Sequence, residues 1–533
     1  MGVNTTVTTS TIMVMGTTDE NASIIFSLRT LLMSILIRVW HILNEDTMLI
    51  IGYNIAVILT IDLGTSSFKS AIWKIGKAGN NVRRIAFNAV PLGITLNDGL
   101  RHETDSGQWL RAFEDCCRSL GSSCATKLSL SDVEAIAISG NGPSLIPVLG
   151  EADACSYGIA AAPARLWLDR RAMQAAEQVS ALMGGFVDAG FFLPKALDIK
   201  NNEAQLYEKT EFFLGCPEFL AFALSGEART VFPSDGFERW FWNDSVLRQL
   251  NLDKNKFPPF IRPGEVFGGL ASHIADQFGF KPGIPIISGG PDFFAAILGA
   301  GVVQPGQVCD RAGTSEGVNA CTKNLIIDDR LMSYSHPVQP FWNLSGIIST
   351  TGKAIEWGCA FLNQTPDEFF NLAGTAQAGA GGLVFLPYLA GERAPVWNPA
   401  ARGILKGLTL SSGQRECARA VLEGICFAIR DIVSIMEEAG ADISELRVAG
   451  SLSSNDRLNQ IKADITGKRI FVPQYREAEL MGLAIIAACT LGKFGSFGEA
   501  ARTLVRAEKV FQPDDTNASL YDELFEEYKG MRN

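Results

Sequence analysis

A short polar turn near the start of the chain carries residue types that are suited to bind a phosphate group. Gly64, Thr65 and Ser66 follow Asp62 at the end of an apolar run, and Lys69 comes shortly after them. Such a turn between two strands gathers backbone N–H groups and two hydroxyls in one concavity, which suits phosphate oxygens. Lys69 adds a cation that could reach the same group. The sequence therefore predicts a phosphate-binding hairpin here.

The same three residue types recur in the second half of the chain, as Gly313, Thr314 and Ser315. Either turn alone could be an ordinary hairpin, because glycine, serine and threonine are common turn residues. Their occurrence once in each half favours a shared phosphate-binding role, and indicates a weak internal duplication.

Two aspartates suggest the chemistry that would accompany a bound phosphate. Asp62 cannot bind a phosphate directly, since like charges repel, but it could hold Mg²⁺ through water. Asp292 follows an apolar strand and a predicted Gly-Gly-Pro turn, and it precedes an apolar helix whose N-terminus would favour a carboxylate. Asp292 is our candidate for a general base that accepts a hydroxyl proton, and the alternative is a plain helix N-cap.

The composition describes an acidic globular protein. With 533 residues the chain is long enough for two or three domains, and its net charge of −11 argues against a nucleic-acid surface. The 11 cysteines show no C-x-x-C spacing and the four histidines are not paired, which predicts reduced thiols, no zinc site and a cytoplasmic protein. P-loop and protein-kinase signatures are absent.

Residues 1–52 form an extension of uncertain role. Its apolar stretch over 22–43 is interrupted by Arg29 and Arg38, so a surface or packed helix is favoured over a membrane span. We expect an appended segment, because a signal peptide is not recognisable and Met48 would suffice as an initiator. Met-Gly at the start also fits the loose myristoylation pattern.

The remaining chain alternates strands and helices through glycine-rich turns, which indicates α/β domains. Strands are predicted over 54–64, 69–75, 133–142 and 284–290, with a strand–turn–strand over 306–321 and a strand before the turn of 445–467. Helices are predicted over 106–121, after Asp292, over 411–440 and 479–492, and in the second part of 445–467. Ser411 or Ser412 could cap the long helix, and Gly440 could end it. A break near 302–304 separates a domain over 53–302 from one over 303–533.

Six segments, in order, resemble the motifs of the FGGY carbohydrate kinases, which share a superfold with actin and Hsp70. They span roughly Val57 to Gly492, and they are IDLGTSSFKSAIW, RLWLDRRA, SGGPDFFAAILGAG, RAGTSEGVN, GERAPVWNPAARGILKGLTLSSGQRECARAVLEG and VAGSLSSNDRLNQIKAD. The resemblance implies two actin-like (ribonuclease H-like) α/β domains with a cleft between them. It also implies ATP-dependent phosphorylation of a sugar or polyol, with Mg²⁺.

The resemblance assigns roles to individual residues. It places the sugar near Trp167, Asp169 and Arg171 in the first domain, and it makes Asp292 the catalytic base. The phosphates would contact Gly313 and Thr314. The adenine or ribose would lie over a turn with Gly450, Ser451 and Asn455. From the residues alone, Asp169 with Arg171 could be an ion pair on a loop, and Asn455 could be a helix N-cap.

Several positions at the expected sugar site depart from the family pattern. Asn141, Gly142 and Pro143 stand where xylulokinases commonly have Gln-Met-His-Gly, Phe293 follows Asp292 where a polar residue is frequent, and Asp198 replaces a tryptophan. Asn141 and Phe293 are nevertheless candidate sugar contacts. A pentulose such as xylulose or ribulose is the first candidate. Glycerol, gluconate and a deoxyhexulose stay open, as do a homodimer and a non-kinase role as an actin-like protein or sugar sensor.

Overall fold

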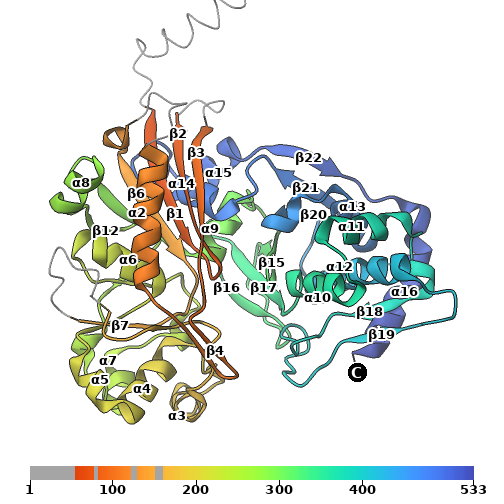
Figure 1. The fold of residues 1–533 in the computed structure, drawn as a ribbon, viewed down its shortest axis with the longest axis horizontal. Coiled ribbons are helices and arrows are strands. Elements are labelled where there is room, and N and C mark those ends of the chain that lie inside the picture. The colour runs from red at the N-terminus through yellow and green to blue at the C-terminus, as the bar shows by residue number, and fades with distance from the viewer. Residues whose placement is uncertain (1–54, 77–81, 122–128, 150–159, 533) are drawn as a thin grey trace, which may run out of the picture. The chain divides into compact units, whose positions relative to one another are not determined.

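The computed structural model of the protein describes residues 55–76, 82–121, 129–149 and 160–532 (Figure 1). The predicted extension over residues 1–52, including its apolar stretch, lies outside the described residues. Within them, the chain forms two main sheets with helices packed against both.

The first sheet has six strands in the order β12-β13-β6-β1-β2-β3. Antiparallel pairs join β1 to β2 and β2 to β3, whereas β6 runs parallel to both β1 and β13. The strands are β1 (Ala56–Leu63), β2 (Ser67–Ile75), β3 (Val82–Pro91), β6 (Ala135–Gly140), β12 (Val266–Gly269) and β13 (Pro285–Pro291).

The second sheet has seven strands in the order β16-β17-β15-β14-β20-β21-β22. Here β14, β15 and β17 form the antiparallel part, and β20 runs parallel to β14 and β21. The strands are β14 (Gln307–Ala312), β15 (Glu316–Thr322), β16 (Met332–Ser335), β17 (Trp342–Ile348), β20 (Glu445–Ala449), β21 (Arg469–Pro473) and β22 (Ala507–Phe511).

The two sheets repeat one plan. In each, three antiparallel strands (β1, β2 and β3 in the first sheet, β14, β15 and β17 in the second) are extended by two parallel strands on the side of the first strand. This duplicated order confirms the prediction of two actin-like, ribonuclease H-like sheets. In each sheet, the first hairpin carries the Gly-Thr-Ser turn.

The predicted helices are present with small shifts at their ends. They are α2 (Gly107–Gly121), α9 (Asp292–Gly299), α12 (Gln414–Glu438), α13 (Asp456–Thr466) and α14 (Ala478–Thr490). Further helices pack around these elements, namely α6 (Cys216–Ser225), α8 (Ser272–Phe278), α10 (Gly352–Leu362), α11 (Pro366–Thr375), α15 (Phe497–Leu504) and α16 (Ala518–Met531).

Two details of the predicted boundaries are wrong. The long helix is capped neither by Ser411 nor by Ser412: it begins at Gln414, where the Gly413 N–H donates to the Glu416 carboxylate at 3.0 Å. Gly440 does follow its end, with a φ of 101°. The Gly-Gly-Pro segment before Asp292 is not a turn, because β13 continues through it with an irregular register and α9 begins immediately afterwards.

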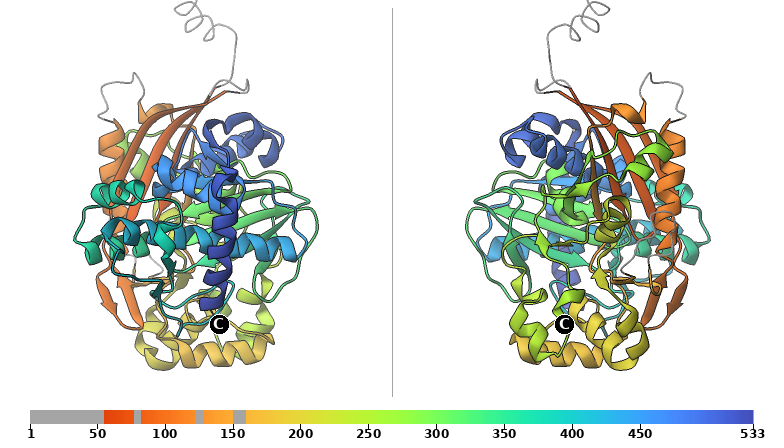
Figure 2. Two further views of the ribbon diagram at one scale, coloured as in Figure 1. Left: turned by 90° about the vertical axis from the view of Figure 1, so that its right-hand side faces the viewer. Right: turned by 90° about the vertical axis from the view of Figure 1, so that its left-hand side faces the viewer.

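Strand β1 is buried along its whole length, because it is covered on both faces. Alternate side chains point to opposite sides of a strand. Val57, Leu59 and Ile61 therefore pack in a core with α2 and α6, whereas Ala56 and Ile58 pack in another core with α9 and α14. Figures 1 and 2 show helices on both sides of these strands.

Helices α9 and α14 cross with their backbones in contact. A Cβ added to Gly482 would lie 1.8 Å from the Ala295 carbonyl oxygen, and one added to Gly299 would lie 1.8 Å from the Ala478 oxygen. Only glycine permits this approach. Helices α14 and α15 lie in sequence between β21 and β22 of the second sheet, but they pack against the first sheet. The division into domains over 53–302 and 303–533 remains a prediction.

A helical segment lies between β6 and β12 in sequence and has its own core, which includes Val179, Leu193 and Trp242. Its helices are α3 (Met173–Met183), α4 (Phe192–Asn202), α5 (Ala204–Lys209) and α7 (Asp244–Gln249). The short strands are β4 (Leu96–Asp98), β5 (Arg101–Thr104), β7 (Ile146–Val148), β8 (Ala164–Arg165), β9 (Phe212–Leu214), β10 (Thr230–Val231), β11 (Phe260–Ile261), β18 (Val384–Leu386) and β19 (Ile404–Lys406).

Nine cysteines lie in the described part of the chain, and all are free thiols, most of them buried. No helix among the described residues is both long enough and apolar enough to cross a bilayer.

We expect Gly482→Ala to lower the unfolding temperature, because the added methyl group must push α14 away from α9. Overpacking of this kind costs about 1–3 kcal/mol. Gly530→Ala is the matched control, since this helical glycine has open space around its Cβ position. Thermal unfolding followed by circular dichroism measures both. Equal unfolding temperatures for the two variants would contradict the close crossing.

Candidate active site

The first hairpin closes tightly between β1 and β2. Leu63 pairs with Phe68, and the Gly64 N–H donates to the Ser67 carbonyl at 3.0 Å. Behind the turn, Asp62 and Lys69 stand opposite each other in the register of the two strands. Thr65 accepts a hydrogen bond from the Trp167 indole at 2.9 Å, so the predicted phosphate hairpin is joined to the predicted sugar segment. Ser66 is exposed at the tip.

The second hairpin is one residue shorter than the first. Ala312 pairs with Glu316, and the Gly313 N–H donates to the Ser315 carbonyl at 2.9 Å. The start of α10 packs against this turn, since the Gly352 N–H donates to the Gly313 carbonyl at 3.0 Å. Thr314 is exposed. The same tripeptide thus forms related hairpins of unequal length.

A buried ion cluster fixes the base of the second hairpin. The Lys462 ammonium of α13 contacts both Asp310 and Glu316, the latter at 3.0 Å, and the Thr351 hydroxyl donates to Glu316 at 2.9 Å. Burial opposes the charge on Lys462, but the two carboxylates raise its pKa. The lysine therefore stays charged and joins α13 to both strands of the hairpin.

The turn with Gly450 lies against the second hairpin. Gly450 has a φ of 84°, and an added Cβ would lie 2.1 Å from the Ala312 carbonyl oxygen, so glycine is required twice over. Ser451 is exposed. Asn455 is the N-cap of α13, with its side-chain oxygen accepting the Leu458 N–H at 2.9 Å.

Charged side chains from both sheets meet where α9 and α14 cross. One guanidinium nitrogen of Arg311 (Nη1), on β14, donates to Asp292 at 2.9 Å and to Glu479 at 3.3 Å. Asp292 stands at the first position of α9, and its Oδ1 accepts the Phe293 N–H at 2.7 Å. Asp62 and Lys69 complete this charge cluster, because both interact electrostatically with Glu479.

The electrostatics of the cluster depend on burial. Burial, reinforced by the carboxylates of Glu479 and Asp292, raises the pKa of Asp62 to about 7, although Lys69 and a 3.1 Å hydrogen bond from Ser139 oppose this. Burial also works against the charges of Lys69 and Glu479. The neighbouring carboxylates nevertheless raise the pKa of Lys69, and Arg311 and Lys69 lower that of Glu479.

The charges of Asp62 and Glu479 suit a hydrated cation. The second carboxylate oxygen of Glu479 (Oε2) is buried and has no hydrogen-bond partner among the described residues, and Asp62 is a carboxylate whose ionisation burial suppresses. A positive ion would give the unpartnered Glu479 oxygen a partner and would favour the ionised form of Asp62. The described side chains form no group of three metal ligands, so such an ion would keep waters, as Mg²⁺ does.

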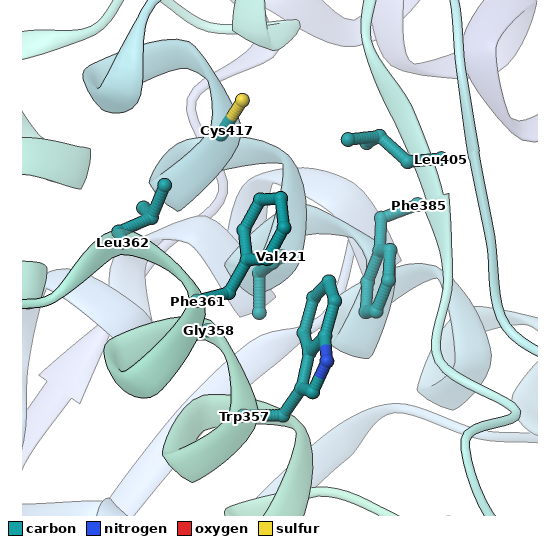
Figure 3. Close-up of a pocket in the computed structure, with 8 residues that line it drawn as sticks. All are labelled: Trp357, Gly358, Phe361, Leu362, Phe385, Leu405, Cys417 and Val421. Atoms are coloured by element: carbon teal, nitrogen blue, oxygen red, sulfur yellow. The ribbon is translucent and has the colours of Figure 1, made fainter.

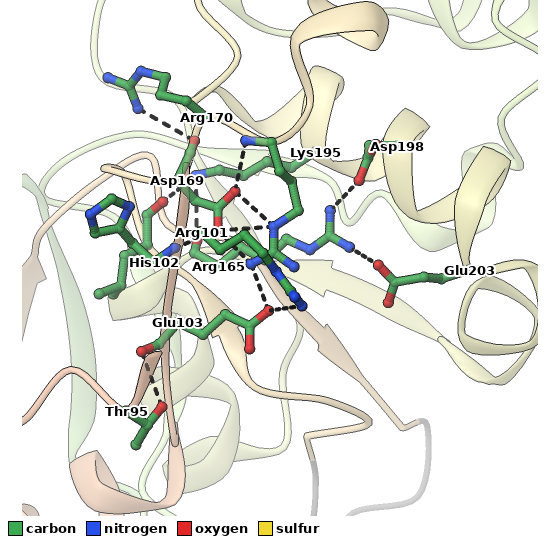
Figure 4. A network of polar contacts seen from close by, with 12 residues as sticks. Thr95, Arg101, His102, Glu103, Arg165, Asp169, Arg170, Lys195, Asp198 and Glu203 are labelled. Atoms are coloured by element: carbon green, nitrogen blue, oxygen red, sulfur yellow. Dashed lines mark hydrogen bonds and ion pairs between the residues drawn. The ribbon is translucent and has the colours of Figure 1, made fainter. Parts of the chain in front are cut away.

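The predicted sugar segment is held by a network of ion pairs (Figure 4). Asp169 is completely buried and accepts the His102 N–H at 2.8 Å and the Arg171 guanidinium at 2.6 Å; Arg171 also contacts Glu103 at 2.6 Å. Burial opposes the charge on Asp169, but these donors lower its pKa. Asp169 and Arg171 therefore form the ion pair that was the alternative prediction.

Other side chains fasten this segment to its surroundings. The buried Lys195 ammonium donates to the carbonyls of Pro143 at 2.8 Å and Leu166 at 2.7 Å. Asp198, which stands where the family has tryptophan, forms a 2.6 Å ion pair with Arg165. Both contacts position the backbone just before Trp167.

Asn141 and Phe293 have partners of their own. The Asn141 amide donates to the Leu63 carbonyl at 3.0 Å and accepts the Ser144 hydroxyl at 2.5 Å, which fixes the end of β6 against the first hairpin. The Phe293 ring packs edge-on to Tyr334, with ring centres 5.5 Å apart. This aromatic contact lies next to Asp292 in sequence.

The structure thus brings Asp62, Lys69 and Asp292 into one cluster. Among the described residues, no hydrogen bond or ion pair joins Asp169 or Arg171 to Asp292. Sequence reasoning missed Arg311 and Glu479. Their signals were present, since Arg311 precedes its glycine by two residues as Asp62 does, and Glu479 is an acid in an otherwise apolar helix.

An apolar hollow between α10 and α12 is a weaker candidate (Figure 3). Trp357 stacks on Phe361 and Phe385 with ring centres 5.2 and 5.3 Å apart, and Cys417 lies at the rim. None of the lining side chains carries a charge that would recognise a phosphate. The charge cluster is therefore the candidate active site.

Comparison with protein families agrees with this geometry. The N-terminal domain model of the FGGY family of carbohydrate kinases matches residues 57–299, and the C-terminal domain model matches residues 311–491. The chain belongs to the FGGY family. This FGGY protein is therefore a phosphotransferase that uses ATP to phosphorylate a sugar.

Curated relatives match most of the chain. A xylulose kinase of Staphylococcus epidermidis is 27% identical over 491 residues, which are 89% of this chain and 96% of the relative. The xylulose kinase of Escherichia coli K12 is 28% identical, with 80% and 88% covered. A glycerol kinase of Thermococcus gammatolerans is 28% identical, with 67% and 76% covered.

Solved structures share the fold. A xylulose kinase from Lactobacillus acidophilus has a TM-score of 0.76 at 23% identity, and a gluconate kinase from the same organism has 0.77 at 24%. Each match covers 90% of this chain and 98% of the other.

We expect Asp62→Asn to change how stability depends on pH. Because the folded state keeps the Asp62 proton up to a pH of about 7 and the unfolded chain releases it near 3.8, ionisation of Asp62 destabilises the wild-type protein increasingly as pH rises between these values. Without metal, the unfolding temperature of the variant minus that of the wild type should therefore increase as pH rises from 3.8 to about 7. Above that pH the difference should stay constant.

Thermal unfolding in EDTA between pH 4 and 8 measures this difference. Asp276→Asn, at an exposed position of α8, is the control. A difference between Asp62→Asn and the wild type that stays constant with pH would contradict the proposed environment of Asp62.

Proposed function

We propose that this FGGY kinase transfers the terminal phosphoryl group of Mg-ATP to a hydroxyl of a pentulose, with xylulose or ribulose as first candidates. The observation that carries the proposal is the position of Asp292. Its carboxylate is 24% exposed, contacts Arg311 of the second sheet at 2.9 Å and interacts electrostatically with Asp62 of the first. The names of the curated xylulose kinases support the pentulose.

Asp292 would act as the general base. Its carboxylate accepts the proton of the acceptor hydroxyl while the hydroxyl oxygen attacks the phosphorus. Its position at the first residue of α9 places the carboxylate beside the positive end of the helix dipole. Trp167, Asp169, Arg171, Asn141 and Phe293 are proposed to shape the sugar site. Since most of these side chains already have protein partners, we assign them mainly to positioning its walls.

The two hairpins would hold the nucleotide from opposite sheets. Backbone N–H groups and hydroxyls of Gly64, Thr65 and Ser66, with Lys69, are proposed to bind phosphate oxygens from the first sheet. Gly313 and Thr314 would do so from the second. Gly450, Ser451 and Asn455 would lie under the adenosine.

Asp62 and Glu479 would hold a hydrated Mg²⁺, which supplies positive charge to the phosphate oxygens when bound. A cytoplasmic location and a homodimer remain predictions from the sequence.

Glycerol and gluconate are the alternative acceptors, because a glycerol kinase and a gluconate kinase are among the similar proteins. We expect acceptor-stimulated ADP release to show its highest kcat/KM with a pentulose. A coupled assay over ketopentoses, glycerol, gluconate and deoxyhexuloses makes this comparison. A clear preference for another acceptor would change the substrate, and ADP release that no acceptor stimulates would contradict the kinase mechanism.

We expect Asp292→Asn to reduce turnover by about 10²–10³-fold, as befits loss of a general base, with acceptor binding largely retained. Asparagine has nearly the same shape but cannot take the proton. Turnover from the coupled assay and acceptor affinity from calorimetry separate the two effects. Asp276→Asn again serves as the control, and near-normal turnover of Asp292→Asn would remove Asp292 from this role.

A further inference from the structure

Arg311 uses only part of its guanidinium group to contact the protein. Nη1 donates to both Asp292 and Glu479, whereas Nε and Nη2 have no partner among the described residues. The side chain is 28% exposed. Arginine often pairs a carboxylate through two parallel N–H···O bonds, which would use two of its nitrogens. Here one edge of a fixed, planar donor group is left available.

The position of Arg311 suggests what that free edge meets. Arg311 lies on β14 two residues before Gly313, at the start of the second phosphate hairpin, and it touches the proposed base on α9. An acceptor hydroxyl at Asp292 and a nucleotide phosphate at the hairpin would therefore flank the guanidinium. Between them lies the place through which a transferred phosphoryl group passes.

Glu479 keeps Arg311 in this place. Its carboxylate is 7% exposed. It lies on α14, which packs directly against the backbone of α9 at Gly482. Because Glu479 and Asp292 share one nitrogen of Arg311, they fix the plane of the guanidinium from two helices. We regard Glu479 as a positioning residue.

We propose that Arg311 is a catalytic residue whose Nε and Nη2 contact the oxygens of the phosphoryl group during transfer. This inference rests on the proposed function and deepens it. The bond from the acceptor oxygen to phosphorus forms as the bond between phosphorus and the β,γ-bridging oxygen of ATP breaks. The acceptor proton goes to Asp292, ADP leaves with the bond electrons, and Arg311 stays protonated.

Proton transfer strengthens the role of Arg311 at the moment of reaction. As Asp292 gains the proton it loses its negative charge, so it holds the guanidinium less strongly. The positive charge of Arg311 is then balanced more by the phosphoryl oxygens. Preorganised charges of this kind act mainly on the transition state, and their removal lowers kcat more than binding.

The test compares four variants of the full chain. We expect Arg311→Gln to lower kcat by about 10²–10³-fold, with the KM for the acceptor and the Kd for ADP within about threefold of the wild type. Arg311→Lys should recover little, because an ammonium lacks the planar pair of donors. Glu479→Gln should lower kcat by about tenfold or less. Arg447→Gln, which removes another arginine paired to a carboxylate, should keep the wild-type kcat.

A second measurement does not depend on turnover. Aluminium fluoride, added with ADP and Mg²⁺, mimics the phosphoryl group during transfer. The wild-type protein should bind ADP more tightly in its presence than ADP alone. Arg311→Gln should lose this increase in ADP affinity. If it fails to fold, the double variant Arg311→Gln/Glu479→Gln replaces it, because the double change removes one charge of each sign.

A kcat of Arg311→Gln within threefold of the wild type, full rescue by lysine, or an unchanged gain from aluminium fluoride would overturn the proposal. If no acceptor is phosphorylated but the increase in ADP affinity with aluminium fluoride depends on Arg311, the proposed function is wrong and the proposed contact of Arg311 with the phosphoryl group is supported. If Asp292→Asn is inactive and Arg311→Gln is normal, the function stands and this inference fails.

Discussion

The contact between the backbones of α9 and α14 is the constraint on which the rest of this site depends. Gly299 and Gly482 remove the side chains that would otherwise separate the helices. The crossing brings Asp292, from the first half of the chain, and Glu479, from the end of the second, to the same point beside β14. One guanidinium, that of Arg311, can therefore reach both carboxylates.

The repeated sheet plan explains why one chain contains two Gly-Thr-Ser hairpins, and the differences between them matter as much as the likeness. Two residues before the glycine, the first hairpin has Asp62 and the second has Arg311. The two sheets thus present opposite charges at equivalent positions. A site between such hairpins can receive both a metal cation and phosphate anions without an excess of either charge.

Much of the fold was predictable from the sequence, because buried strands and the long α12 carry strong apolar patterns. The cap of α12 was not, since Gly413 uses its backbone and the Glu416 side chain rather than a serine. Local motifs also pointed to residues 62, 69 and 292, which the structure brings into one charge cluster. The bridge from Arg311 to Glu479 was not, because it joins residues 168 positions apart and depends on how two helices cross.

The hydrogen bond from the Trp167 indole to Thr65 joins the segment assigned to the acceptor to the turn assigned to the nucleotide. An acceptor that reoriented the indole would change the freedom of the threonine, and a nucleotide that engaged the threonine would do the reverse. Free-energy coupling between two ligands is mutual, so each ligand changes the affinity of the protein for the other by the same factor. With these assigned roles, a single side-chain contact would let each substrate alter the affinity for the other.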